Sequence, residues 1–199
     1  MNLTPPEATH LSAAELQAGL EGILQSPKDG GLLQLIVRRP GTDAREVLQE
    51  AELTLAEGLV GDHWKARGSR RTPDGGPHPE MQLTIMNARA IALVARQKDR
   101  WPLAGDQLYL DLDLSTANVP PGTCLAIGSA ILEITAPPHT GCKKFEARFG
   151  TEALRFFNSP EGRQLQLRGV HAKIVQGGRI RVGDAARKIT DPQTTLSPA

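Results

Sequence analysis

Cys142 is the residue of this chain whose surroundings most favour chemistry. It lies in the segment 136–145 (APPHTGCKKF), where two prolines stiffen the approach and a glycine lets the backbone turn. His139, Lys143 and Lys144 place positive charge around the sulfur. Nearby cations stabilise the thiolate, which is the form of cysteine that attacks substrates and binds metals. The segment therefore predicts a reactive or metal-binding sulfur rather than an inert packed thiol.

The residues after Cys142 indicate a helix. Phe145 and Phe149 recur at helical spacing, so we expect a helix that begins at Lys143. Cys142 would then stand at a helix N-terminus, where the helix dipole also favours negative charge. His139 could donate a proton to the site or partner the thiol, or it could only hydrogen-bond the backbone of its Pro-Pro turn.

A second set of chemical groups lies in the long polar segment 58–80. The segment is rich in glycine and proline, so it has little means of forming a core. Loops of this length inside a small domain are either disordered or functional. We expect the segment to fold over the sulfur and to supply local positive charge, the alternative being a solvated loop. The candidates for this role are His63, Lys65, Arg67, Arg70 and Arg71.

The overall charge excludes several classes of partner. The chain has 199 residues, with 23 Lys and Arg against 22 Asp and Glu, so its net charge is +1. No global field favours nucleic acid or a membrane surface, and any basic site must be local. No apolar stretch approaches the roughly 20 residues of a membrane span, and the first ten residues lack the features of a signal peptide. We expect a cytoplasmic protein, monomeric or homodimeric, with both cysteines as free thiols.

Strand patterns dominate the elements that must position these groups. Hydrophobic runs and turn signals predict strands over 32–37, 45–55, 81–85, 107–114, 123–127, 130–135, 170–176 and 179–182. Residues 45–55 are expected to pair with 32–37, residues 130–135 with 123–127, and residues 179–182 with 170–176, as hairpins. Glycine-aspartate pairs mark Asp106 and Asp184 as turn residues, and Cys124 is interpreted as a small core residue.

Two helices complete the expected elements. A capping box formed by Ser12 and Glu15 predicts a helix over 13–25, and Asn87 is placed to cap a helix that ends at about Gln97. The pattern predicts a mainly β fold with α, a closed or partly open β-barrel with peripheral helices. We divide the chain into an N-terminal helical extension over 1–29, the barrel domain over 30–189 and a C-terminal tail over 190–199.

Seven short motifs occur in order along the chain. They are GLVGDH at 58–63, QLTI at 82–85, AGDQL at 104–108, PGT at 121–123, IG at 127–128 with LEIT at 132–135, PHTGCKKF at 138–145, and RGV at 168–170 through VGD at 182–184. Together, over about residues 32–188, they resemble the MOSC domain, named for the C-terminal region of molybdenum cofactor sulfurase. The resemblance implies a mainly β-barrel fold that binds the molybdenum-pterin cofactor or transfers sulfur to it.

The resemblance also implies roles for individual residues. Cys142 matches the family cysteine that carries sulfur or ligates molybdenum, with His139 as its catalytic neighbour. The implied cofactor-binding residues are His63, Lys65, Arg67, Arg70, Arg71, Thr140, Gly141, Lys143 and Lys144. Molybdenum in a pterin dithiolene accepts a soft thiolate, and the pterin phosphate needs cations or backbone N–H groups at close range.

Partners follow from what the chain lacks. Full-length sulfurases also carry a pyridoxal-phosphate domain, for which 199 residues leave no room, so no pyridoxal phosphate is expected on this chain. Sulfur would have to come from a separate donor such as a cysteine desulfurase. For reduction of N-hydroxylated compounds, which stand-alone members of the family perform, electrons would have to come from an electron-transfer protein. Two cysteines cannot supply the four thiolates of a typical iron-sulfur cluster, and the chain has no G-x-G-x-x-G nucleotide motif.

Two other functions remain open. The protein could hold or hand over the cofactor without catalysis, using the basic loop for the phosphate. It could instead build a zinc or thiol-hydrolase site from Cys142, His139, His63 and His78. The absence of the close-paired C-x-x-C spacing of structural zinc sites disfavours this reading.

Overall fold

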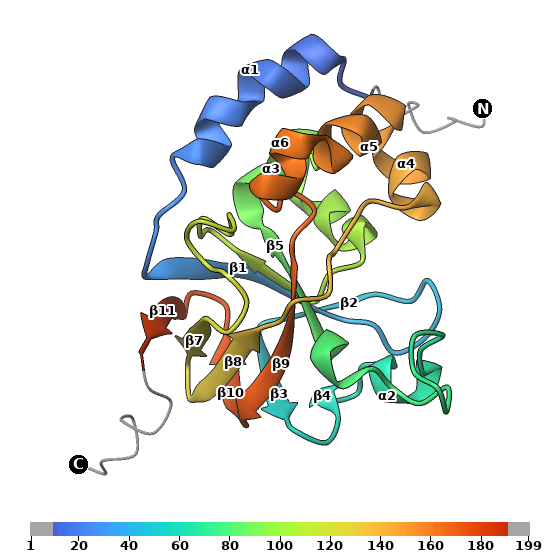
Figure 1. Ribbon diagram of the computed structural model, residues 1–199, viewed down its shortest axis with the longest axis vertical. Coiled ribbons are helices and arrows are strands. Elements are labelled where there is room, and N and C mark those ends of the chain that lie inside the picture. The colour runs from blue at the N-terminus through green and yellow to red at the C-terminus, as the bar shows by residue number, and fades with distance from the viewer. Residues whose placement is uncertain (1–9, 191–199) are drawn as a thin grey trace, which may run out of the picture.

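The computed structural model describes residues 10–190, and its centre is a closed β-barrel with most of its helices gathered at one end and α2 at the other (Figure 1). This confirms the predicted fold class. The seven barrel strands are β1 (Gly31–Arg38), β5 (Leu83–Asn87), β6 (Leu108–Leu110), β7 (Cys124–Ile127), β8 (Ala130–Ile134), β9 (Val170–Gln176) and β11 (Ala185–Ile189).

Pairing between the first and last of these strands closes the barrel. The strands follow the order β11, β7, β8, β9, β5, β6, β1, and β1 then pairs with β11. The pairs are antiparallel except β5 with β6, which are parallel and are joined by a helical crossover. A closed barrel of this kind leaves few free strand edges, so the interior positions form one continuous core.

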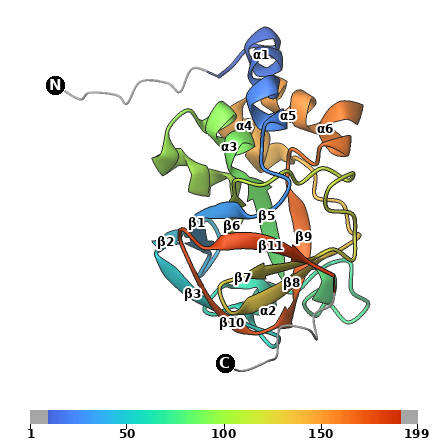
Figure 2. The same cartoon turned by 90° about the vertical axis from the view of Figure 1, so that its left-hand side faces the viewer.

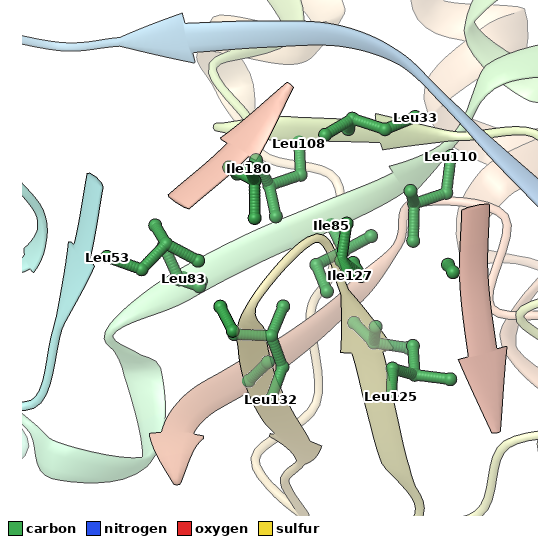
Figure 3. Packing of buried hydrophobic residues seen from close by; sticks show 14 of the residues in the cluster. Leu33, Leu53, Leu83, Ile85, Leu108, Leu110, Leu125, Ile127, Leu132 and Ile180 are labelled. Atoms are coloured by element: carbon green, nitrogen blue, oxygen red, sulfur yellow. The ribbon is translucent and has the colours of Figure 1, made fainter. Parts of the chain in front are cut away.

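Side chains that alternate between the two faces of the strands form two hydrophobic cores, one inside the barrel and a second one under the helices. On β5, Leu83 and Ile85 point into the barrel, whereas Met86 joins the cluster under the helices. On β6, Leu108 points into the barrel and Tyr109 faces outward to the helices. This is the two-residue period of a strand with both faces covered. Figure 3 shows the barrel core, filled by leucine and isoleucine from strands on every side.

The predicted hairpin of residues 170–176 with 179–182 is wrong. β9 already pairs with β8 on one edge and β5 on the other, so it has no free edge for residues 178–181. The chain instead leaves the barrel at Gly177, and β10 (Gly178–Arg181) pairs with β3 (Glu50–Thr54), which also pairs with β4 (Gly58–Leu59). The first predicted hairpin is half right, because β2 (Glu46–Leu48) pairs with β1 whereas β3 turns away to this small sheet.

Six helices and two 3-10 segments lie among residues 10–190. They are α1 (Ala13–Leu24), α2 (Trp64–Arg67), α3 (Ala88–Ala95), α4 (Lys143–Phe149), α5 (Thr151–Asn158), α6 (Pro160–Gln164), η1 (Pro79–Met81) and η2 (Lys98–Ala104). Figure 2 shows α1, α3, α4, α5 and α6 as a layer over one end of the barrel. No helix within residues 10–190 is long and apolar enough to cross a membrane.

The predicted caps are present. Ser12 and Glu15 form the capping box of α1, with Ser12 N donating to Glu15 Oε2 at 2.8 Å. Asn87 accepts from the backbone of Arg89 and Ala90 at the start of α3, which ends at Ala95 rather than near residue 97. Both helices bury their apolar faces in the second core. The predicted tail 190–199 falls outside the described residues from position 191 onward.

The helix that follows Cys142 is held by aromatic packing. The ring centroids of Phe145 and Phe149 on α4 are 4.9 Å apart, and Phe145 lies 5.1 Å from Phe157 on α5. All three side chains are fully buried. Each buried phenylalanine contributes about 1.5–3 kcal/mol of transfer free energy, so α4 and α5 form a firm platform for the segment before them.

Candidate functional site

A cavity of about 540 Å³ lies where the loop after β1, the segment 60–81, the start of α4 and the start of β9 meet. This is within the usual volume of a small-molecule site. Its wall contains Cys142 together with an unusual number of cationic side chains. The charged and imidazole residues that line it are Arg39, Asp43, Arg45, His63, Arg67, Arg71, His139, Lys144, Arg148, Arg168 and His171.

Cys142 is the N-cap residue of α4, as the sequence predicts, and its thiol is exposed at the cavity. Gly141 fixes the backbone just before it. Its N–H donates to Asn158 Oδ1 at 2.9 Å, and Asn158 Nδ2 donates to its carbonyl at 3.2 Å. A Cβ at position 141 would lie 2.6 Å from the end of the Leu154 side chain, so a larger residue here would require that side chain to move. Asn158 therefore sets where the thiol stands.

Asp43 neutralises part of the rim near the thiol. Its carboxylate accepts from Lys144 Nζ at 3.0 Å and from Arg148 Nη2 at 3.0 Å. These two cations lower the pKa of Asp43, with Lys144 the larger cause. Lys144 is therefore next to the cavity but already has a carboxylate partner.

Two buried ion pairs build the floor. Arg39 makes a bidentate contact with Asp62, at 2.9 Å from Nε and 3.0 Å from Nη2. Arg168 Nη1 donates to Asp106 at 2.6 Å and Nη2 donates to the carbonyl of Ala104 at 2.8 Å. Both carboxylate side chains are fully buried. Asp106 is thus a buried ion-pair partner, and the turn interpretation from sequence is wrong, whereas Asp184 does bond its own turn through Arg181 N.

Three arginines at the cavity have no carboxylate partner among residues 10–190. They are Arg45, Arg67 and Arg71. Burial lowers the pKa of Arg45, as do Arg148 and Arg39 beside it. Burial and Arg39 lower the pKa of Arg67. Arginine keeps its proton in proteins, so these shifts express first the cost of burying a charged guanidinium and second the repulsion of neighbouring cations, and an anion in the cavity would offset both.

The histidines hold different positions at the wall. His63 Nδ1 contacts the carbonyl of Arg39 at 2.7 Å. The rings of His139 and His171 lie 4.6 Å apart, and His139 Nδ1 is 3.5 Å from Asp106 Oδ1. Burial, followed by Arg168, lowers the pKa of His171 to about 4, and burial lowers that of His139 well below its ordinary value. At neutral pH, His139 and His171 are therefore neutral imidazoles among fixed cations.

The structure brings most of the sequence-predicted site residues together. Those that line the cavity are His63, Arg67, Arg71, His139, Thr140, Cys142 and Lys144. Lys65, Arg70, Gly141 and Lys143 do not line it. Gly141 acts through the backbone beside Cys142, and Arg70 lines a neighbouring open hollow with Arg67 and Arg71. The expectation that the long segment reaches the cysteine holds for its arginines at positions 67 and 71.

Sequence reasoning missed the residues supplied by distant elements. They are Arg39, Arg45, Arg148, Arg168, Asp106 and His171. Two of these residues lie in motifs that the sequence analysis identified: Asp106 in AGDQL and Arg168 in RGV. Neither motif indicates that the side chain is buried. No group of three or more His, Cys, Asp or Glu side chains within residues 10–190 is arranged to hold a metal ion, so the proposed zinc set of Cys142, His139, His63 and His78 does not form.

Comparisons with known proteins identify the fold. The model of the MOSC domain family matches residues 74–187. The YuaD protein from Bacillus subtilis superposes with a TM-score of 0.57 at 12% identity, covering 78% of this chain and 93% of YuaD. YiiM from Escherichia coli superposes with a TM-score of 0.52 at 16% identity, covering 80% of this chain and 70% of YiiM. No sequence among curated proteins matches the chain.

Proposed function

The chain belongs to the MOSC domain family, which is associated with the molybdenum cofactor, and on that premise we propose that its cationic cavity binds the molybdenum-pterin cofactor. One observation carries the proposal. An exposed thiol and three arginines without carboxylate partners, within residues 10–190, line a single cavity of about 540 Å³. A ligand that offers both an anionic group and a soft metal satisfies both features at once.

The residues present fit such a ligand. Arg67 and Arg71 would hold the phosphate, because arginine donates to phosphate oxygens in a planar, bidentate manner. Arg45, whose Nε and Nη1 donate to the carbonyls of Pro102 and Ala44, would add its charge and its Nη2 donor. Cys142 would offer its thiolate to molybdenum from an exposed N-cap position. When bound, the cofactor would supply two-electron chemistry to the cavity. The fixed Arg39 and Arg168 ion pairs would keep the floor in place beneath it.

We propose reduction of N-hydroxylated compounds as the reaction that this cavity supports. An N–O bond breaks, an amine and water form, and the step consumes two electrons and two protons. The electrons come from a separate electron-transfer protein. His139, at the wall, is placed to hand a proton into the cavity.

A sulfur-transfer role uses the same thiol. The Cys142 thiolate attacks the outer sulfur of a persulfide on a donor such as a cysteine desulfurase, and the donor leaves as its own thiolate. The exposure of Cys142 favours this alternative, because a donor protein must reach the sulfur. A carrier that only holds the cofactor is the third reading, and it requires the arginines but not the thiol.

Substitution of the two cysteines separates these readings. Cys142→Ala should lose N-hydroxy reduction, assayed with a reducing partner, by at least about a thousandfold, and should lose persulfide formation while retaining the pterin. Cys124→Ala is the matched control, because Cys124 is buried on β7 outside the cavity. Unchanged N-hydroxy reduction and persulfide formation in Cys142→Ala would contradict both roles of the thiol. Wild-type protein that holds the pterin but shows neither activity would support the carrier reading.

A further inference from the structure

The segment that contains α2 carries a concentration of positive charge. The chain has 23 lysines and arginines, all within residues 10–190, and ten of them form an ion pair with a carboxylate there. Four of the others, Lys65, Arg67, Arg70 and Arg71, lie within seven consecutive positions, and all four are exposed. We call these four residues the basic patch. Cations this dense create a local positive potential even though the net charge of the chain is only +1.

The loop that carries the basic patch is held in shape by its own hydrogen bonds. Ser69 N donates to the carbonyl of Gly75 at 3.2 Å, and Gly75 N donates to the carbonyl of Thr72 at 3.1 Å. The hydroxyl of Thr72 donates to the carbonyl of Gly76 at 2.6 Å. The one acidic residue of segment 64–76, Asp74, accepts from Gly76 N at 2.9 Å within its own turn. The cations therefore extend from a preformed support, which lowers the entropy cost of binding a partner.

The basic patch borders the entrance of the candidate site. Arg67 and Arg71 line both the cavity that contains Cys142 and a neighbouring open hollow of about 680 Å³, and Arg70 lines the hollow alone. No acidic residue within the described part of the chain lines this hollow. Figure 1 shows α2 and the loop after it projecting outward from the barrel. A protein that covers the hollow would therefore stand next to the proposed cofactor.

Carboxylate side chains of another protein are the groups that this surface fits best. An arginine guanidinium binds a carboxylate through two parallel hydrogen bonds, and an open hollow admits side chains that project from a protein surface. Nucleic acid fits less well, because single strands also need exposed aromatic rings for base stacking. Trp64, the one aromatic residue of segment 64–76, is only 5% exposed.

We propose that the basic patch is the docking surface for an acidic face of the electron-transfer protein that serves the cavity. The inference rests on the proposed function, because the reduction is what requires an electron donor. Conversion of an N-hydroxylated compound to an amine and water consumes two protons, taken from water, and two electrons. Two molecules of a one-electron carrier therefore pass from reduced to oxidised in each turnover. Each must arrive and leave, and attraction between opposite charges makes such encounters fast and reversible.

Association kinetics with two acidic carriers, a two-iron ferredoxin and a flavodoxin, test the proposal by surface plasmon resonance. For at least one carrier, raising the salt from about 20 to about 200 mM should lower the association rate constant of the wild type about tenfold or more. Lys65→Glu/Arg70→Glu should lower that constant by about ten- to a hundredfold at low salt and weaken its salt dependence. The dissociation rate constant should change less, because these charges lie outside the cavity.

A matched control variant separates the basic patch from net charge. Lys28→Glu/Arg187→Glu changes the charge of the chain by the same amount, and both residues are exposed and line neither the cavity nor the hollow. Arg187 lies on β11, on the other side of the barrel from α2 (Figures 1 and 2). Association of this variant should stay within about threefold of the wild type. Equal slowing in the two double variants would overturn the docking surface.

The pterin content of the same proteins distinguishes the docking surface from the proposed function. Lys65 and Arg70 do not line the cavity, so Lys65→Glu/Arg70→Glu should keep the pterin of the wild type. A wild type that holds pterin but binds neither carrier, or that binds duplex DNA more tightly than both, overturns the docking surface and leaves the cofactor proposal standing. A wild type without pterin overturns the proposed function, and with it this role of the basic patch.

Discussion

At the residue scale, the cavity contains two kinds of arginine. Some are buried in ion pairs with aspartate, and others have no carboxylate partner among residues 10–190. Asp62 and Asp106 each neutralise one arginine beneath the cavity, whereas Arg45, Arg67 and Arg71 keep their charge for a ligand. A buried pair costs desolvation, and its partners must supply several hydrogen bonds to recover it. The cavity wall therefore carries a net positive charge because only some of its arginines are paired with a carboxylate.

Removal of the Asp62 carboxylate should destabilise the whole protein. Asp62 accepts from the backbone and side chain of Arg39 and from Trp64 N, and its side chain is fully buried. Asp62→Ala leaves these donors and a buried guanidinium unpaired, so we expect the free energy of unfolding to fall by about 3–5 kcal/mol in urea titration. Asp99→Ala, on the surface, should change it by less than about 0.5 kcal/mol. Equal losses in the two variants would contradict this account.

His171 should make stability depend on pH. Its folded pKa of about 4 lies below the ordinary value of about 6.5, so the unfolded chain binds more protons between these values. Stability should therefore rise with pH across that window and be lost as pH falls through it, by up to about 3 kcal/mol. His139 acts in the same direction and Asp106 in the opposite one. The difference between wild type and His171→Gln in urea unfolding at several pH values isolates this effect, and a constant difference would refute it.

At the element scale, α4 and α5 place the thiol. Packing of Phe145 against Phe149 and Phe157 fixes the two helices, and Asn158 at the end of α5 clamps Gly141. Cys142 follows directly and caps α4. The position of the sulfur is thus set by an element that lies after it in the chain.

Loss of this clamp should loosen the thiol segment without harming the barrel. Asn158→Ala removes two hydrogen bonds, so we expect about 1–2 kcal/mol of stability to be lost, faster exchange of the Gly141 amide proton, and roughly tenfold weaker retention of the pterin. Asn118→Ala is a matched control, because Asn118 Nδ2 donates to the carbonyls of Lys28 and Asp113 away from the cavity. Asn118→Ala should lose similar stability but keep the amide protection and the pterin. The same pterin loss in both variants would show that the clamp has no specific role.

At the scale of the whole molecule, the features that could be predicted from the sequence are those determined by residues close together in the chain. Cys142 and its helix, the two capped helices and the β7–β8 hairpin all follow from neighbours a few residues apart. The partner of β10 could not be predicted, because it depends on which edges of β9 are already occupied by other strands. Motif order identified the barrel as a resemblance, which the family match confirms.

Only part of the candidate site could be predicted from the sequence, because the rest depends on contacts between distant segments. Arg67 and Arg71 lie in a conspicuous polar segment, whereas Arg39 and Arg168 lie in ordinary strand ends and meet the cavity only when β1 and β9 take their places around the barrel. Gly-Asp at positions 105–106 has the pattern of a turn, and nothing local reveals that its carboxylate is buried against an arginine 62 residues away. Burial and long-range pairing are properties of the closed barrel, not of a segment.

The central claim is that the unpaired arginines and Cys142 together hold the molybdenum-pterin cofactor. Its most direct test is the molybdenum and pterin content per chain of protein purified from cells that make the cofactor. The account predicts stoichiometric molybdenum and pterin in the wild type, molybdenum and pterin still in equal amounts in Cys142→Ala because the dithiolene holds the metal, and neither in the Arg67→Ala/Arg71→Ala double variant. Wild-type protein that carries no pterin and takes none up from a cofactor-loaded extract would contradict it.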